Sequence, residues 1–424
     1  MESRRRFFKQ MAAVTGAVAL NQAFNKTIAQ KLADYQLVKP NVYNDEEFWL
    51  WVRNQFLLPD RLINLNNGGV SPSPLCVQKA LFEYYDFSNH GPSFFMWREL
   101  DKKREPLMTK LAALCGCDPG EIAINRNATE ALNTIIFGLD FKKGDEVVTA
   151  MQDYPNMINA WAQREKRDGV VIKRLSLKLP EDNDDVLVDA YVQAFTKRTK
   201  LVYITHIINW TGQIMPVKRI AAEAHKRGIE VLVDGAHSFA HLNYKIPDLD
   251  ADYYGTSLHK WLLAPLGTGM LYIKKEKIGK VWPLLSNNEP AGNNIKKFES
   301  LGTRSFATEM AISEAVDFFD ITGAAKKQER LQFLRQYWVN QVKDNPNVVF
   351  NSSLEPGKIN AICNVKLRNM TTSELDSRLY EKYHIHTVGI QWPGVDGVRI
   401  TPNVFTSTSD LDRLVTALHE LSRV

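Results

Sequence analysis

The sequence predicts an α/β fold, and three observations lead to this expectation. Short apolar runs rich in valine and isoleucine alternate with helical patterns from about residue 145 onward. One helical pattern separates two of these runs, which gives the strand, helix and strand unit of a parallel sheet. The last third of the chain has long helical patterns and few strand-like runs. We therefore expect a large α/β domain followed by a smaller α+β domain.

The strands expected in the large domain are short and are bounded by glycine, proline or charged residues. They are EVVTAM (146–151), VVIKRLSL (170–177), KLVYITHI (200–207) and IEVLVDGA (229–236). The helix between the last two has Pro216 where a first helical turn tolerates proline, and Gly228 where a helix ends.

The smaller domain is expected to begin near residue 290. Its expected elements are a helical segment over 311–343, strand-like runs at 361–367 and 398–402, and a closing helix over 408–421. The helical segment has one break, at Gly323. The closing helix carries an apolar stripe, and Thr408 or Ser409 can act as its N-cap.

Length and composition limit the classes of protein to consider. A chain of 424 residues is too long for one small core, and 44% apolar with 24% charged residues is typical of a soluble globular protein. The net charge of +5 is small and no basic run has interleaved aromatics, so no nucleic-acid partner is expected. The four cysteines are too few and too uneven for a disulfide framework or a zinc site, so no metal is expected.

The N-terminus has the pattern of an export signal. Five residues follow the order of a twin-arginine signal, namely Ser3, Arg4, Arg5, Phe7 and Lys9. The apolar stretch after them, 11–20, has about half the length of a membrane span. We therefore expect residues 1–30 to direct export of the folded protein to the periplasm, with no membrane segment left after cleavage.

Polar residues follow the expected strands of the large domain. Asp234 and His237 come after one strand, Asn209 after another, and Asp153 and Tyr154 after a third. Ligands of α/β proteins bind beyond the carboxyl ends of the strands, which share one edge of a parallel sheet. We therefore expect these side chains to converge on a ligand.

Lys260 and Asp234 together indicate the chemistry of this edge. A lysine in a pocket of low polarity can lose its proton near neutral pH and act as a nucleophile and base. A buried aspartate is costly unless a cation meets it, and the protonated nitrogen of a pyridine ring is such a cation. This pair describes a pyridoxal phosphate site.

A phosphate cradle is expected at the segment NATEALN. It offers the amides of Ala128 and Thr129 at a helix N-terminus, together with the Thr129 hydroxyl. Thr129 is also a good N-cap residue, which is the simpler explanation for it. Ser257 and His259, just before Lys260, can add further donors.

The segment DADYYGTSLHKWLLAPLGTGMLYI, with DGAH before it, resembles the cofactor-lysine signature of class V pyridoxal-phosphate enzymes. Further segments follow in the family's order, namely INLNNGGVSPSP (63–74), INRNATEALNTI (124–135), THIINWTGQIMPV (205–217), ESLGTRSFA (299–307) and GVRITPNVFTSTSDLDRL (397–414). NNGG and GTR are most similar to the isopenicillin N epimerase-like branch. The resemblance spans nearly all of the mature chain and implies fold type I, with a mainly parallel seven-stranded-type sheet and a smaller α+β domain.

The resemblance implies roles for the cofactor-binding residues. Lys260 would form the internal aldimine, Asp234 would pair with the pyridine nitrogen and His237 would bind the phenolic oxygen. Thr129, Ser257 and His259 would bind the phosphate, together with the Ala128 amide. Tyr154 stands where many relatives place a stacking histidine, and a tyrosine shuttles protons less readily near neutral pH.

The resemblance also implies substrate contacts and an assembly. Arg399 would bind the substrate carboxylate with its two-pronged geometry. Asn209 would contact the cofactor or the substrate, and Asn67 the substrate. Thr303 would reach the phosphate of a neighbouring subunit, which implies a homodimer with shared sites. The implied division is a signal at 1–30, an arm at 31–63 packing on the small domain, a large domain at 64–290 and a small domain at 291–424.

The implied activity acts on an amino acid, or a substrate that contains one, through an external aldimine and loss of the Cα proton. Cysteine desulfurases need a mobile cysteine shortly before the substrate arginine, and the segment HIHTVGIQWPGVDGVR has none. Epimerisation or racemisation, transamination, and β-elimination by a C–S or other lyase stay open. A non-catalytic binding protein of the same fold is the alternative from another class, and it predicts loss of Lys260, Asp234 or Arg399.

Overall fold

The computed structural model describes residues 44–423, in which a seven-stranded sheet forms the centre of the larger part. Its strands are β2 (Ile122–Asn125), β3 (Glu146–Ala150), β4 (Val171–Leu175), β5 (Thr199–Thr205), β6 (Glu230–Asp234), β7 (Tyr253–Ser257) and β8 (Gly269–Ile273). They lie in the order β2-β8-β7-β6-β5-β3-β4, and β8 runs antiparallel to both of its neighbours. The other neighbouring pairs are parallel, which confirms the predicted α/β class and the mainly parallel sheet.

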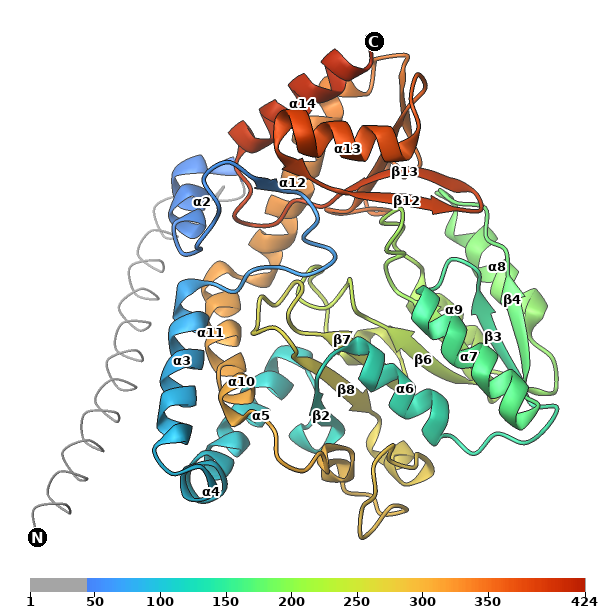
Figure 1. The fold of residues 1–424 in the computed structure, drawn as a ribbon. Coiled ribbons are helices and arrows are strands. Elements are labelled where there is room, and N and C mark those ends of the chain that lie inside the picture. Colours follow the sequence, from blue (N-terminus) through green and yellow to red (C-terminus); the bar gives the residue numbers. More distant parts are fainter. Residues whose placement is uncertain (1–43, 424) are drawn as a thin grey trace, which may run out of the picture.

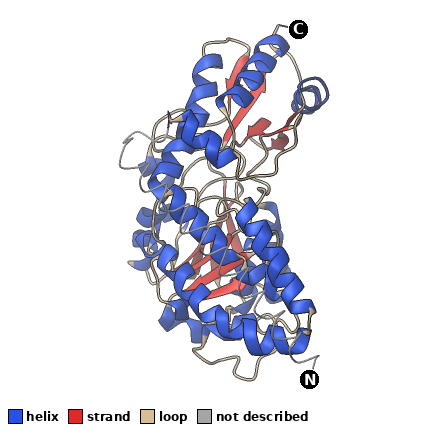
Figure 2. Ribbon diagram, turned by 90° about the vertical axis from the view of Figure 1, so that its left-hand side faces the viewer, coloured by secondary structure: helices blue, strands red, loops and turns tan. Residues whose placement is uncertain are grey.

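Helices cover both faces of this sheet, as Figure 2 shows. They include α6 (Ala128–Gly138), α7 (Pro155–Asp168), α8 (Asp184–Ala194) and α9 (Val217–His225). Buried apolar side chains form one large cluster on each side of the strands. Pro216 is the N-cap residue of α9, one position before the first turn, and Gly228 has a φ of +69° beyond its end.

A second group of helices packs beside the large sheet (Figure 1). It comprises α3 (Leu75–Asn89), α4 (Pro92–Phe94), a π-helical turn (Phe95–Leu100), α5 (Arg104–Cys115), α10 (Phe306–Met310) and α11 (Ile312–Thr322). Lys110 of α5 donates to Ser313 and Asp317 of α11, both at 2.8 Å. The segment 306–322 therefore packs on the larger part, although it lies beyond the boundary expected at residue 290.

The smaller part contains a four-stranded antiparallel sheet in the order β12-β13-β10-β9. Its elements are β9 (Val348–Phe350), β10 (Cys363–Leu367), β12 (Val388–Trp392), β13 (Val395–Ile400), α13 (Thr372–Tyr383) and α14 (Thr408–Leu421), while α12 (Ala324–Val342) connects it to the larger part. The break at Gly323 between α11 and α12 is confirmed, with a φ of +77°. The closing helix is confirmed as well, but its cap was predicted wrongly: the Ser407 hydroxyl accepts the Asp410 N–H at 3.1 Å.

The segment before residue 75 joins the two parts. β1 (Ile63–Asn64) pairs in parallel with β11 (Ile385–His386), and α2 (Glu46–Arg53) lies against the smaller part. Arg53 donates to Asp410 of α14 at 2.6 Å. The ring of Trp210, from the larger part, stacks on that of Trp392 at the end of β12, with centroids 5.2 Å apart and planes 6° from parallel. In the described range, no helix combines the length and apolar composition needed to cross a bilayer.

Candidate active site

The predicted site residues gather at the carboxyl edge of the large sheet. β3, β5, β6 and β7 run in parallel, so their last residues meet at this edge. Asp234 is the last residue of β6, and the loop after β7 carries Lys260. Arg399 reaches the same place from β13, because its guanidinium donates to the main-chain oxygen of Asn209 at 3.1 Å. The fold thus brings Asn209 and Arg399 into contact although they lie 190 positions apart.

Lys260 is partly buried at this edge, and its Nζ is 3.4 Å from Nε2 of His237. Burial lowers the pKa of the Lys260 amine from 10.5 to about 8; the charge of Asp234 opposes this and that of Arg399 adds to it. About a tenth of the amine is therefore unprotonated at pH 7, far more than for a lysine in water. That state can attack a carbonyl and can accept a proton.

Asp234 is a buried carboxyl with two neutral partners. Its Oδ1 accepts the Ala236 N–H at 2.9 Å and its Oδ2 accepts the Tyr203 hydroxyl at 2.8 Å. Burial raises the pKa of Asp234, while these hydrogen bonds and the charge of Lys260 lower it. A cation placed against this carboxyl would offset the cost of burying its charge.

Buried polar atoms without partners surround Lys260. Within residues 44–423, Nδ1 of His237, Oδ1 of Asn209 and Nε of Arg399 have no hydrogen-bond partner. Such atoms are rare in folded proteins, and a group of them indicates the place of a ligand. Amine, carboxyl, imidazole and amide groups around one lysine fit a pyridine aldehyde with a ring hydroxyl, so these residues fit pyridoxal phosphate.

Arg399 is buried, and burial lowers the pKa of its guanidinium to about 10. Its Nη2 donates to Oδ1 of Asn66 at 2.8 Å. Asn67, which was predicted to contact the substrate, instead uses its amide N–H groups on the main-chain oxygens of Asn64 and Thr401, both at 2.9 Å. Asn66 is therefore the asparagine that contacts Arg399, whereas the Asn67 side chain stabilises the turn.

Gly68 belongs to the same turn and explains part of the NNGG segment. A Cβ atom at this position would lie 3.4 Å from Cζ of Arg399 and 3.4 Å from Cε1 of His237. A side chain here would crowd both groups. The glycine thus lets the turn approach the two polar side chains closely.

The segment expected to bind the phosphate forms the N-terminus of α6. Asn127, not Thr129, caps this helix, because its Oδ1 accepts the Glu130 N–H at 2.9 Å. The Ala128 N–H donates to the Ser257 hydroxyl at 2.9 Å, which joins the helix to the end of β7. His259 binds the main-chain oxygen of Thr268 through Nδ1 at 2.8 Å, so its other ring nitrogen stays available.

Tyr154 and Thr303 lie at the surface of the single chain. Tyr154 precedes α7 with 39% of its surface exposed, and Thr303 is exposed in the loop before α10. The charge of an ionised Tyr154 would raise the pKa of Arg399, which shows that the two groups are near each other. Their roles toward the cofactor ring and a second subunit stay predictions.

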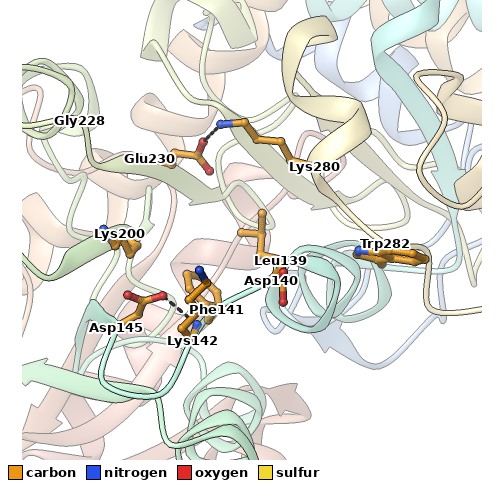
Figure 3. A pocket seen from close by; sticks show the side chains of 10 residues that line it. All are labelled: Leu139, Asp140, Phe141, Lys142, Asp145, Lys200, Gly228, Glu230, Lys280 and Trp282. Carbon is orange, nitrogen blue, oxygen red and sulfur yellow. Dashed lines mark hydrogen bonds and ion pairs between the residues drawn. The ribbon is translucent and has the colours of Figure 1, made fainter.

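A separate pocket of about 610 Å³ lies at the other end of the strands (Figure 3). It is lined by Leu139, Asp140, Phe141, Lys142, Asp145, Lys200, Gly228, Glu230, Lys280 and Trp282. Two of its three carboxyls have local partners, since Lys280 donates to Glu230 at 2.9 Å and the Lys142 N–H donates to Asp145 at 2.8 Å. None of the predicted site residues reaches it, so the carboxyl edge remains the candidate active site.

Comparison with known proteins agrees with this fold and site. The aminotransferase class-V family model matches residues 63–389, so the chain belongs to this family of pyridoxal-phosphate enzymes. Isopenicillin N epimerases of Streptomyces clavuligerus and Amycolatopsis lactamdurans are each 27% identical and cover 88% of the chain, over 98% and 99% of their own lengths. They place the chain in the isopenicillin N epimerase-like branch. A cysteine desulfurase of Thermococcus onnurineus has the same fold, with a TM-score of 0.78 and 21% identity over 88% of this chain and 97% of its own.

Sequence reasoning missed three contributors to the site. Asn66 is next to the residue that was chosen, and only the turn geometry shows which of the two asparagines faces Arg399. Tyr203 lies in the run 201–205 of β5, in which every residue is buried, and nothing in its pattern separates it from core residues. Gly68 was part of a quoted segment, but its close neighbours become visible only in the structure.

Proposed function

We propose that this protein removes the Cα proton of an amino acid, or of a substrate containing one, and acts as an epimerase or racemase or as an aminotransferase. The observation that carries the proposal is the joint placement of Lys260, Asp234 and Arg399 at one edge. The proposal is supported by the 3.4 Å contact of Lys260 Nζ with His237, three residues after Asp234, and by the charges of Asp234 and Arg399, which both act on the pKa of Lys260.

Each of the three groups has a separate task in this reaction. When bound, pyridoxal phosphate withdraws electrons from the substrate Cα and makes its proton acidic. Asp234 holds the ring nitrogen as a cation, and Arg399 orients the substrate through its carboxylate with two parallel N–H donors. Lys260, with its lowered pKa, accepts the proton at Nζ and can return it.

Cysteine chemistry is not favoured in the described part of the chain. The turn between β12 and β13, just before Arg399, contains no cysteine and is held by the stack of Trp392 on Trp210. Cys363 lies in the buried strand β10, where burial raises the pKa of its thiol to about 11. A thiol in this state is a poor nucleophile at neutral pH. β-Elimination, which needs no cysteine nucleophile, is the competing reaction.

The decisive experiment incubates the holoprotein in D₂O with a panel of L- and D-amino acids. Deuterium at Cα with inverted configuration indicates epimerisation, a new oxo acid indicates transamination, and pyruvate with a released thiol or sulfide indicates elimination. Lys260→Ala should lose the exchange. A pyridoxyl adduct on Lys260 after borohydride reduction, with no exchange for any amino acid, would instead favour a non-catalytic binding protein.

We further propose that two chains form a dimer and that the protein is exported. The exposed position of Thr303 leaves it free to contact a second subunit. Light scattering, which measures the molar mass of the protein in solution, tests the dimer. The predicted export signal lies outside the described residues, and the proposal depends on its sequence pattern alone. Fractionation of cells that express the chain with Arg4 and Arg5 intact, or both replaced by lysine, tests the periplasmic location.

A further inference from the structure

Asp153 is a buried carboxyl to which the proposed function assigns no role. It follows β3 and is 1% exposed. Its Oδ2 accepts the Ala150 N–H at 2.7 Å, and its Oδ1 accepts the Thr205 hydroxyl at 2.7 Å. Both partners are neutral, and no lysine, arginine or histidine of the described chain forms an ion pair with it. A buried carboxyl without a cation is costly, so its presence needs an explanation.

Thr205 connects Asp153 with Asp234. Thr205 and Asp234 are the last residues of β5 and β6 and lie side by side in the register of these parallel strands. Side chains at matched positions point to the same face of a sheet, as do residues two apart along a strand. Tyr203 therefore shares that face, and its hydroxyl donates to Asp234 at 2.8 Å. The two carboxyls, the threonine and the tyrosine form one buried cluster.

The charges of this cluster are coupled. The pKa of Asp153 is raised to about 7, mainly by burial and in part by the nearby charge of Asp234, against the hydrogen bonds from Ala150 and Thr205. The charge of Asp153 also acts on two other titratable groups, Tyr203 of β5 and Tyr191 of α8. The pKa values of both tyrosines are raised, mainly by burial. They remain neutral, so within this cluster Asp153 is the group whose charge changes near neutral pH.

We propose that Asp153 is a positioning residue for the cofactor, which adds a second negative charge behind Asp234 and so strengthens the hold of Asp234 on the cationic ring nitrogen. The inference depends on the proposed use of Asp234 as the partner of that nitrogen. The hydrogen bond to Ala150 alone could be made by an asparagine, so a purely structural role does not require a carboxyl at this position.

The test compares Asp153→Asn with wild type for affinity toward pyridoxal phosphate at pH 6 and pH 8.5. We expect nearly equal affinity at pH 6, where Asp153 holds a proton, and about tenfold weaker binding by the variant at pH 8.5. Glu314→Gln is a matched control, since Glu314 of α11 is also buried with its pKa raised to about 7. The affinity of Glu314→Gln for pyridoxal phosphate should be close to that of wild type at both pH values. If the affinity of Asp153→Asn relative to wild type is the same at pH 6 and pH 8.5, the inference is overturned.

Thermal unfolding gives a readout that does not need catalysis. A carboxyl whose pKa is raised from 3.8 to about 7 by folding makes the wild type less stable as pH rises through that window. Without cofactor, Asp153→Asn should therefore gain a few degrees in Tm over wild type at pH 8.5 and less at pH 5. Bound pyridoxal phosphate should reduce this gain in Tm, because the ring cation stabilises the Asp153 anion. The difference in Tm between Glu314→Gln and wild type should be the same with and without the cofactor. A gain of Asp153→Asn that the cofactor does not alter contradicts the proposal.

A second variant covers the case in which Asp153→Asn fails to fold. Thr205→Val removes the hydroxyl that stabilises the Asp153 anion, so Asp153 should lose its proton at a higher pH than in wild type. The contribution of Asp153 to the affinity for pyridoxal phosphate should therefore appear at a higher pH. The same pH dependence in Thr205→Val and wild type contradicts the proposal. If wild type yields no pyridoxyl adduct on Lys260 after borohydride, the proposed function itself fails. If the adduct forms and the pH response of Asp153→Asn equals that of wild type, only the role of Asp153 fails.

Discussion

Replacing Lys260 with methionine should stabilise the cofactor-free protein while it removes the reactive amine. Burial lowers the pKa of Lys260 from 10.5 to about 8, a fall of about 2.5. At 1.36 kcal/mol per unit, this corresponds to about 3 kcal/mol by which folding opposes the charged amine. Methionine has a similar length and no charge, so the variant should recover about 2–3 kcal/mol at pH 7.

The pH dependence of this gain identifies its cause. Below pH 8 the amine is charged in both states and the full penalty applies. Between pH 8 and 10.5 only the unfolded chain holds the proton, so wild type becomes more stable as pH rises and the gain of the variant disappears. Urea denaturation of the cofactor-free proteins at pH 7 and pH 10 measures both values. Lys200→Met, at an exposed lysine, is the control and should change little. A gain that is equal at the two pH values would refute the burial argument.

Three further predictions concern neighbouring positions. Arg399→Lys should raise KM for the substrate about 100-fold with a smaller effect on kcat, because lysine lacks the paired donors; a change in kcat alone would argue against a carboxylate contact. Asp234→Asn should weaken cofactor binding at least about 100-fold in equilibrium titration, because the ring nitrogen loses its counter-charge, and undiminished binding would remove Asp234 from that role. Gly235→Ala should prevent native folding, since its Cβ would lie 1.9 Å from the Tyr254 ring; a soluble variant with the wild-type Tm would contradict this close packing.

The sequence was sufficient to predict the large sheet and the main groups of the site. Runs of valine and isoleucine can be buried on both faces only as central strands, and β5 and β6 occur where such runs lie. Parallel strands place their carboxyl ends at one edge, so the convergence of Asp234, Asn209 and Asp153 followed from the order of elements alone. The family segment supplied Arg399, which no strand pattern would single out.

The remaining details depend on geometry that a linear pattern does not contain. Ser407, Thr408 and Ser409 can all cap a helix, and the path of the chain before α14 decides in favour of Ser407. Asn66 and Asn67 are chemically identical, and the turn directs one toward Arg399 and the other toward the main chain. The packing of α10 and α11 on α3 and α5 is set by contacts between distant segments, which periodicity cannot show.

The stacked rings of Trp210 and Trp392 connect the larger and smaller parts at a point close to the Arg399 site. Indoles with centroids 5.2 Å apart are close enough for their electronic transitions to couple, and the twist between the two transition dipoles sets the size of the resulting circular dichroism signal. Any rotation of one part against the other would separate the rings and weaken that signal. The circular dichroism of this tryptophan pair can therefore report, without an attached dye, whether the two parts move relative to each other when substrate enters.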